Sequence, residues 1–469
     1  MRKLPLILAL MLLCASAVVA PALHGQESQA HADFRGEGER FKASCEDIAF
    51  KKLPGCAELL FTDHPLHIAF GSIAPQNGFG AGGAYVGHYT PNELWRTSWD
   101  ADAIASENAS WRAGFYYKAI HTPIEKIHVI TTTSGPPPRS NLTVRPYAVY
   151  NFVAQSISLD QLFFYGLGPN SLKANASVFG MTQTIAGINA IVPVLRGLNA
   201  SLLGEINGRF VDVRGNHHES SPSIEQFFTE ATAPGLTTQP TFVQLGEGAR
   251  LEPALFNDHL QLDYLAQFQQ FVAASDSHYS FRRFNADLDH TIPLYRNAGS
   301  YGPKPINGPD ECAASLGATK CAAMQRNREG SVELRLHITA SIASAGSVVP
   351  FYFQPTLGGS DIDGNSWLPS YNDYRFRAPN VLLLREGFEH SIWGPIGFTF
   401  SADQGKVVLT RGDVGFDNLA HSFSAGLTVR AGGLPALILG FAWGGSEGTH
   451  TISTVSNTLL GGSSRPALF

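Results

Sequence analysis

Apolar and polar residues alternate with a period of two along several stretches of this chain. In LQLDYLAQFQQF, residues 260–271, Leu262 and Tyr264 fall on one face, and Gln267 and Gln269 fall on the other. In SVELRLHITASI, residues 331–342, the polar face carries charges of both signs. Successive side chains of a strand point to opposite faces, so this pattern predicts strands with one apolar side and one polar side.

The alternation recurs along the chain, whereas helical spacing does not. It is present in LNASLLGEINGRF, ASWRAGFYYKAI, FRRFNADLDHTIPL and HSFSAGLTVR. Beyond the first 22 residues, the longest apolar run is 434–443, about half of the roughly 20 residues that a membrane-spanning helix needs. The sequence therefore predicts an all-β fold.

Two kinds of β protein fit this alternation: a soluble sandwich or propeller with one solvated face, and a transmembrane barrel. The predicted strands reach ten or more residues, whereas soluble strands average about five or six. Aromatic residues gather near strand ends, as in the girdles of membrane barrels; they are Trp95, Trp99, Trp111, Tyr116 and Tyr117. Because backbone groups in lipid must all be paired, such a sheet has to close on itself.

We therefore predict that residues 65–469 form a transmembrane antiparallel β-barrel. At roughly 25 residues for a strand and its connection, the barrel has about 16 strands. Three long stretches without alternation, residues 211–240, 296–330 and 357–379, are expected as outside loops. The predicted location is the outer membrane, in contact with its lipid.

The amino-terminal region predicts export. Residues 1–22 carry Met-Arg-Lys, an apolar run and small residues in the order of a signal peptide. Residues 23–64 are then a short periplasmic segment. Four cysteines remain, and short local disulfides, Cys45 with Cys56 and Cys312 with Cys321, are the simplest pairing in an exported chain. Structural zinc is the alternative, although no CxxC or nearby histidine pair supports it.

Other chemistry is weakly indicated. The formal charge of −6 and the lack of a basic run give no sign of nucleic-acid binding. Asp361, Asp363 and Asn365 resemble the start of a calcium loop, but Asn372 stands where a bidentate Glu is needed, which favours a turn. No G-x-S-x-G is present. We predict no catalytic residue, metal or cofactor; an outer-membrane lipid hydrolase of another geometry stays an alternative, because Ser, His, Asp and Glu abound on the polar faces.

The stretch from Leu357 to Val407 is the most informative. It contains a Gly-Gly exit from a strand, a polar loop and the run Arg375-Phe376-Arg377, followed by two strands that include Asp403. A carboxylate and a guanidinium are costly against lipid and favourable against water or each other. This stretch is therefore expected to fold into the interior of the barrel.

Several segments, in order, resemble the bacterial surface antigen barrels of the BamA and TamA superfamily. They are FFYGLGPNS, FRRFNADLDHTIPLYRN, VPFYFQPTLGG, Tyr371 with RFRAPN, FEHSIW and the Asp403-Gln-Gly405 run, and they cover 163–469 and, loosely, the chain back to Pro65. The resemblance implies a transport or assembly pore, or a structural barrel. It implies no enzyme, and it implies protein partners in the periplasm or the outer membrane.

The chain departs from the family at two places. The family's inward loop has a Leu-Arg-Gly-Tyr tip whose arginine meets the Asp of a Phe-x-Asp-x-Gly strand, whereas this chain has Leu368-Pro369-Ser370-Tyr371. Either Arg375 or Arg377 then takes its place, or the contact is weakened. We predict that Arg375 pairs with Asp403; the alternative is that Arg375 ends a strand at the rim and Asp403 is solvated. The set expected to hold the loop in the lumen is Tyr371, Arg375, Phe376, Arg377, Asp403 and Gly405. The segment before Pro65 is also too short for the periplasmic POTRA domains of family members that insert or secrete proteins.

Overall fold

A computed structural model describes most of the second half of the chain and much of the first. The described residues are 39, 66–92, 94–121, 147–216, 221–256, 259–301, 324–393, 396–431, 434–455 and 466–468. The predicted signal peptide, the periplasmic segment apart from Glu39, and the residues Cys45, Cys56, Cys312 and Cys321 lie outside them. The chain divides into two compact units, residues 1–67 and 68–469. Within the described ranges, no helix is long and apolar enough to cross a membrane.

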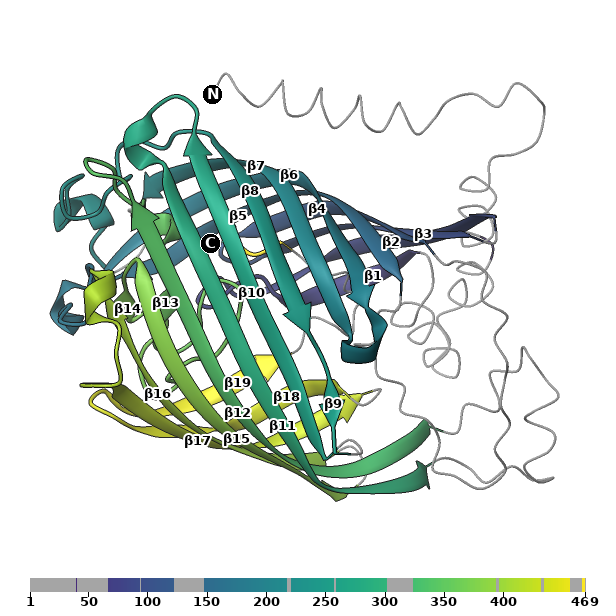
Figure 1. Ribbon diagram of the computed structural model, residues 1–469. Helices are drawn as coiled ribbons and strands as arrows, with labels where there is room; N and C mark the ends of the chain where they lie inside the picture. Colours follow the sequence, from purple (N-terminus) through teal and green to yellow (C-terminus); the bar gives the residue numbers. More distant parts are fainter. Residues whose placement is uncertain are drawn as a thin grey trace, which may run out of the picture. The chain divides into compact units, whose positions relative to one another are not determined.

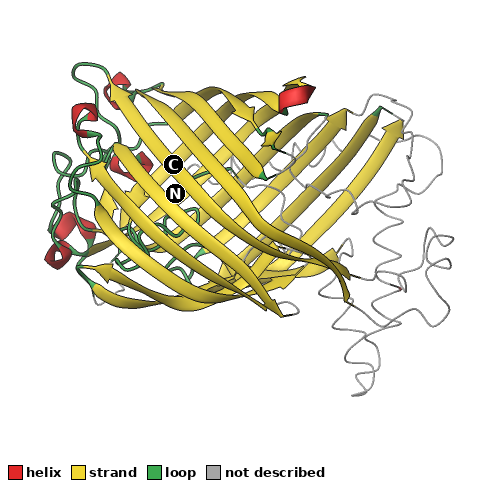
Figure 2. Cartoon of the chain, turned by 60° about the horizontal axis from the view of Figure 1, so that its bottom comes forward, coloured by secondary structure: helices red, strands yellow, loops and turns green. Residues whose placement is uncertain are grey.

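The second unit is built almost entirely of strands (Figures 1 and 2). The strands are β1 (Leu66–Ser72), β2 (Phe79–Asn92), β3 (Trp95–Ser106), β4 (Trp111–His121), β5 (Ala148–Phe164), β6 (Ser177–Leu195), β7 (Ala200–Gly215), β8 (Phe242–Leu251), β9 (Ala254–Leu255), β10 (Leu260–Ala273), β11 (Phe281–Tyr301), β12 (Met324–Ala343), β13 (Thr356–Leu357), β14 (Phe376–Arg377), β15 (Asn380–Trp393), β16 (Ile396–Val408), β17 (Ala420–Ala431), β18 (Leu434–Gly445) and β19 (Gly448–Val455).

Seventeen of these strands form one sheet, and β13 pairs with β14 in a separate short ribbon. From β2 to β19 the strands of the large sheet pair antiparallel with their neighbours in chain order. β8 and β9 both pair with β10 and are one strand interrupted at 252–253, which leaves 16 strand positions among the described residues. The predicted all-β antiparallel sheet is confirmed.

The two faces of the curled sheet differ as the alternation predicts. On β7, Leu202, Ile206 and Phe210 are about half exposed on the outer face, at 52%, 46% and 50%. Asn207 and Arg209 alternate with them and are buried on the inner face. An apolar outer surface and a polar interior follow from the period of two.

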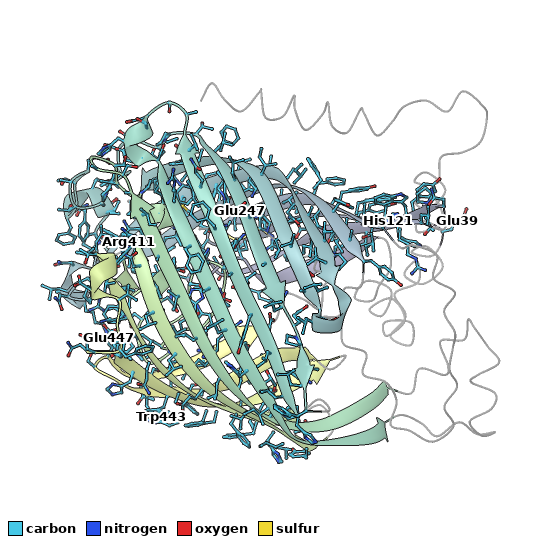
Figure 3. All side chains as sticks on the ribbon, viewed as in Figure 1. Glu39, His121, Glu247, Arg411, Trp443 and Glu447 are labelled. Atoms are coloured by element: carbon cyan, nitrogen blue, oxygen red, sulfur yellow. The ribbon has the colours of Figure 1, made fainter. Side chains whose placement is uncertain are left out.

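Antiparallel pairing also decides which connections share an end of the sheet. One end, here termed the loop end, carries the connections 165–176, 216–241, 274–280, 344–379 and 409–419. β11 ends and β12 begins at the other end, so the stretch 296–330 cannot share a side with 211–240 and 357–379. The expectation that all three are outside loops is wrong. Each strand reverses the direction of the chain, so successive connections alternate between the two ends of the sheet. Figure 3 labels Arg411 and Glu447 at the loop end and His121 at the opposite end.

Aromatic side chains lie near both ends on the outer face. Toward the opposite end, Trp95 packs against His121 at 4.8 Å and Tyr150 at 5.9 Å between ring centroids. Toward the loop end, Trp443 packs against Phe423 at 6.2 Å. Tyr116, assigned to a girdle from its position, instead points inward, is buried, and donates a hydrogen bond of 2.6 Å to Gln155.

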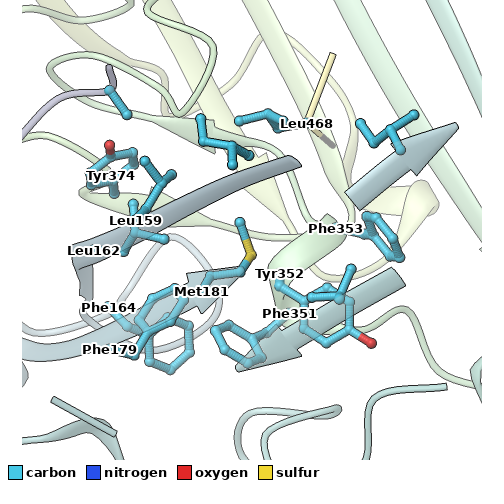
Figure 4. Packing of buried hydrophobic residues seen from close by; sticks show 14 of the residues in the cluster. Leu159, Leu162, Phe164, Phe179, Met181, Phe351, Tyr352, Phe353, Tyr374 and Leu468 are labelled. Atoms are coloured by element: carbon cyan, nitrogen blue, oxygen red, sulfur yellow. The ribbon is translucent and has the colours of Figure 1, made fainter. Parts of the chain in front are cut away.

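A hydrophobic core fills the loop end of the interior (Figure 4). It joins wall residues of β5 and β6, such as Phe164 and Phe179, to Phe351 and Phe353 of the 3-10 helix η6 (Phe351–Phe353). The connection 216–241 closes over it, because the Phe351 N–H donates to the Pro234 carbonyl at 2.8 Å. The interior of the sheet is therefore packed at this end rather than open.

Candidate functional site

The connection between β12 and β15, residues 344–379, folds into the interior. It passes through η6 and β13, turns at 361–365, and returns through β14. Gly358 and Gly359 begin the inward leg with φ of 102° and 59°. A Cβ on Gly359 would come within 2.6 Å of the Asp373 backbone on the return leg, so the Gly-Gly pair lets the two legs lie side by side.

The turn at 361–365 is held by its own side chains. Asp361 accepts hydrogen bonds from the backbone N–H of Asp363 at 3.0 Å and of Asn365 at 2.8 Å, and from the Asn365 side chain at 2.9 Å. These bonds use the Asp361 carboxylate within an Asx-type turn. Residues 361–365 thus form the expected turn.

The tip of the connection sits on a charged pair of the wall. The Arg385 guanidinium of β15 meets the Asp403 carboxylate of β16 at 2.6 Å and 2.5 Å. The same carboxylate accepts the backbone N–H of Leu368 at 2.9 Å, and Arg385 donates to the Ser366 carbonyl. Arg385 and Asp403 are direct partners in the sheet register. The tip is thus fixed through its backbone to a preformed ion pair.

Trp367 completes this contact. Its ring lies 4.6 Å from the Arg385 guanidinium carbon and 5.6 Å from that of Arg335, and it stacks on His337 at 6.2 Å. Cation–π contacts of this kind are worth more when the ring is desolvated, and Trp367 is buried. Residues 366–368 with Arg385 and Asp403 are termed the tip seat below.

The return leg is bound by a second ion pair. Arg375 pairs with Glu447 of the β18–β19 turn and donates to the Ser171 hydroxyl at 2.9 Å and the Ser171 carbonyl at 2.8 Å. The Asn372 N–H also donates to Glu447, at 3.0 Å. Arg375 thereby joins three connections at the loop end.

The predicted pair between Arg375 and Asp403 is wrong. Asp403 and Arg385 occupy adjacent strands on the same face, so the sheet itself brings them together. Arg375 lies on the return leg, beyond the tip, where Glu447 is its partner. The guanidinium that the tip lacks is supplied by the wall rather than by another part of the loop.

The other residues of the predicted set lie around the same connection. Tyr371 is buried and packs edge-on against Phe376 at 5.2 Å. Gly405 lies under the start of the connection, where a Cβ would come within 2.9 Å of the Leu382 carbonyl and 3.2 Å of Leu357. Their proposed role in holding the loop stays a prediction.

Arg377 belongs to a different contact, which holds η6. It donates to the carbonyls of Phe351 at 2.9 Å and Gln354 at 3.3 Å, and Arg283 of β11 donates to the Phe353 carbonyl. Both guanidinium groups are buried and face phenyl rings at 5.4 Å to 5.9 Å. No described carboxylate lies within ion-pair distance of either. We term this group, Phe351, Phe353, Gln354, Arg283 and Arg377, the aromatic clamp.

A cavity of about 1330 Å³ remains beside the inward connection. Residues 359–373 of the connection line one side, and the rest of the lining includes the β1–β2 turn, Tyr165, Lys173 and β19. Its lining includes Asp363, Asp373 and His450. The interior therefore keeps a polar space next to the seated loop.

A carboxylate, an imidazole and a hydroxyl also lie in a row on the inner wall. His337 contacts Asp287 at 2.9 Å through one ring nitrogen and Thr339 at 3.1 Å through the other. Thr339 is 3% exposed, its hydroxyl also donates to Asn285, and Trp367 stacks on the histidine. A nucleophile needs access to substrate, and this hydroxyl has none. The row is a wall network that supports Trp367.

Within the ranges that the structure describes, no group of three or more His, Cys, Asp or Glu side chains is placed to hold a metal ion.

Two residues of the site escaped sequence reasoning, Arg385 and Glu447. Arg385 had a visible signal, because it is a charged residue directly after the apolar run VLLL and lies at an inward position of the same strand. Glu447 had none, since it is one carboxylate in a short turn whose partner lies 72 residues away.

No protein-family model matches the sequence, and no curated protein matches it. Among solved structures, the chain is similar to CdiB from Acinetobacter baumannii, with 9% identity and a TM-score of 0.43, covering 83% of this chain and 56% of that one. It is also similar to CdiB from Escherichia coli, with 10% identity and a TM-score of 0.46, covering 84% and 61%. BamA from Haemophilus ducreyi lacking POTRA domains 1–3 gives 10% identity and a TM-score of 0.45, covering 84% and 68%.

Proposed function

We propose that this protein is an outer-membrane β-barrel of the surface-antigen type, acting as a transport or assembly pore or as a structural barrel. Its lumen is occupied at rest by the inward connection. Residues 65–469 form the barrel, after a signal peptide of 22 residues and a periplasmic segment. Its surroundings are outer-membrane lipid, and its partners are periplasmic or outer-membrane proteins.

The observation that carries this proposal is the contrast between the two faces of the sheet. Apolar side chains such as Leu427 and Leu439 are 51% and 50% exposed on the outer face, which suits lipid. The inner face holds the buried ion pair of Arg385 and Asp403, with the connection 344–379 seated upon it. A soluble sandwich would bury its apolar face against a second layer instead.

The orientation follows from the direction of β1. The β1–β2 turn, residues 73–78, lies at the loop end, so the chain enters β1 at the opposite end. A periplasmic segment before β1 therefore puts the loop end, with the inward connection, on the outside of the cell.

Reconstitution tests the proposal. The purified chain should resist unfolding in unheated gel electrophoresis and migrate differently after heating, as barrels do. In planar bilayers a pore should show small conductance that increases when residues 360–372 are replaced by Gly-Gly, because the deletion enlarges the space beside the loop. If the protein is a structural barrel, neither the wild type nor the deletion variant should conduct. A soluble protein would not enter bilayers. Release of fatty acid from phospholipid would support the hydrolase alternative.

A further inference from the structure

Residues 466–468 lie inside the described barrel unit rather than along a strand. Figure 4 labels Leu468 in the same cluster as Tyr374 and Phe353, and it is 5% exposed. Pro466 has no N–H to offer a ladder, which is consistent with its place outside the sheet. This short segment is therefore an occupant of the lumen.

One directional contact fixes the segment. The backbone N–H of Leu468 donates to the Asp363 carboxylate at 2.9 Å. Asp363 stands in the turn of the inward connection and lines the cavity of about 1330 Å³. Its neighbour Ile362 packs against the cluster that holds Leu468. A pocket for an apolar side chain and an acceptor for a main-chain N–H are two features by which extended peptides are recognised.

A cation lies near this carboxylate. Arg209 of β7 is 2% exposed and interacts electrostatically with Glu205 and, more weakly, with Asp363. Its side chain donates to Gln244 at 2.5 Å, but among the described residues its Nη1 has no hydrogen-bond partner. A buried guanidinium with a free N–H favours an anionic partner.

We propose that Asp363, the apolar pocket around Leu468 and Arg209 form a lumenal binding site for an extended peptide segment. The ligand class is a peptide with a leucine or similar apolar side chain, whose N–H meets Asp363, followed by a carboxylate that meets Arg209. In the structure the site is filled by residues 466–468 of the chain itself. An incoming segment of the same chemistry competes for the site only by displacing them.

Peptide binding in trans tests this site. A labelled peptide with the sequence of residues 461–469, GGSSRPALF, is titrated onto full-length barrels in detergent. In Leu468→Asp the internal segment is expelled, because a second carboxylate would face Asp363 in an apolar pocket, and the peptide should bind. The wild type and Ala467→Asp, whose changed residue is exposed, should bind at least about tenfold more weakly, because their own tethered segment competes.

Two further variants assign the contacts. In the Leu468→Asp background, Asp363→Ala should weaken peptide binding by about tenfold, the effect of one hydrogen bond to a charged group. Arg209→Met should abolish the preference for a free carboxylate over a carboxyl-terminal amide on the peptide. A peptide with Asp in place of its leucine should not bind.

Equal binding to the wild type, Ala467→Asp and Leu468→Asp would overturn the proposal, and so would a folded Leu468→Asp barrel that binds nothing. If that variant does not fold, maleimide labelling of Leu468→Cys and Ala467→Cys decides. Maleimide should label the cysteine at position 467 faster than the one at position 468, and excess peptide should raise the labelling rate at position 468. Equal labelling rates that do not depend on peptide would reject the site. Since these assays measure no conductance, their outcome and that of the pore experiment are independent.

Discussion

The aromatic clamp and the tip seat hold the same connection to the wall by opposite chemistry. In the clamp, Arg283 and Arg377 bind main-chain carbonyls and phenyl rings, and no described carboxylate pairs with them. In the tip seat, Arg385 pairs with Asp403, and the pair holds backbone groups of the tip. The clamp depends on packing and the seat on charge. The same connection is thus held at its root by packing and at its tip by charge.

The largest expected effect is loss of packing in the clamp. Phe353→Ala removes a fully buried ring that contacts Phe242 and Phe271, and it should lower the free energy of unfolding by about 3–5 kcal/mol. Phe416→Ala, at a residue 67% exposed, should change it by less than about 0.5 kcal/mol. Urea unfolding of reconstituted barrels, followed by gel mobility, measures both. Equal losses would mean that η6 is not part of the stable core.

The tip seat should give a smaller, coupled effect. Asp403→Ala leaves Arg385 and the Leu368 N–H without their acceptor and should cost about 3 kcal/mol, the low end for a buried pair, because the Arg385 side chain is 19% exposed. Protease cleavage of the inward connection should accelerate with it.

A double-mutant cycle distinguishes the partners of Asp403. The effects of Asp403→Ala and Arg385→Ala should be far from additive, whereas those of Asp403→Ala and Arg375→Ala should add within about 0.5 kcal/mol. Strong coupling to Arg375 instead would restore the pairing expected from the sequence and contradict the geometry.

Charged substitutions test which side chains of the surrounding wall lie on the outer face and which lie on the inner face. Leu336→Arg places a charge on the outer face and should cost about 2–4 kcal/mol if the residue lies near the bilayer midplane. Gln267→Arg should be mild, because Gln267 faces inward and bonds to Glu205 at 3.1 Å. Thr339, also on the inner face, is not a suitable control, since it is buried in the His337 network. The yield of refolding into lipid vesicles compares the two variants. Equal impairment would refute the assignment of Leu336 to the outer face and Gln267 to the inner face.

The smallest expected effect is on the connection 216–241, which covers the clamp. Burial raises the pKa of Glu230, but hydrogen bonds from Gly235, Thr237 and Tyr279 outweigh it and hold the pKa below its ordinary value. A lowered folded pKa contributes stability that is present above the ordinary carboxyl pKa and is lost as the pH falls through the lowered one.

Limited proteolysis of this connection measures the effect. Cleavage in the wild type should increase on acidification through that range, whereas Glu230→Gln should be cleaved readily at every pH and show little pH dependence. A pH dependence unchanged in Glu230→Gln would assign it to another group.

The sequence by itself determined the strands, their two faces and the inward course of 357–379. A period of two specifies which side chains share a face wherever the strand lies, so Asn207 and Arg209 could be assigned to the interior without a fold. The Gly-Gly pair and the charges between apolar strands likewise carry local signals of an inward connection.

Only the tertiary structure decided which charges meet. The pair of Arg385 and Asp403 depends on the register between β15 and β16, and Arg375 meets Glu447 because two connections share the loop end. Neither the register of two strands nor the end at which a connection lies can be read from composition or periodicity. Register depends on the alignment of each strand with its neighbour, and the end of a connection depends on the number of strands before it. The same reason explains the wrong side expected for 296–330 and the unforeseen place of Leu468 beside Asp363.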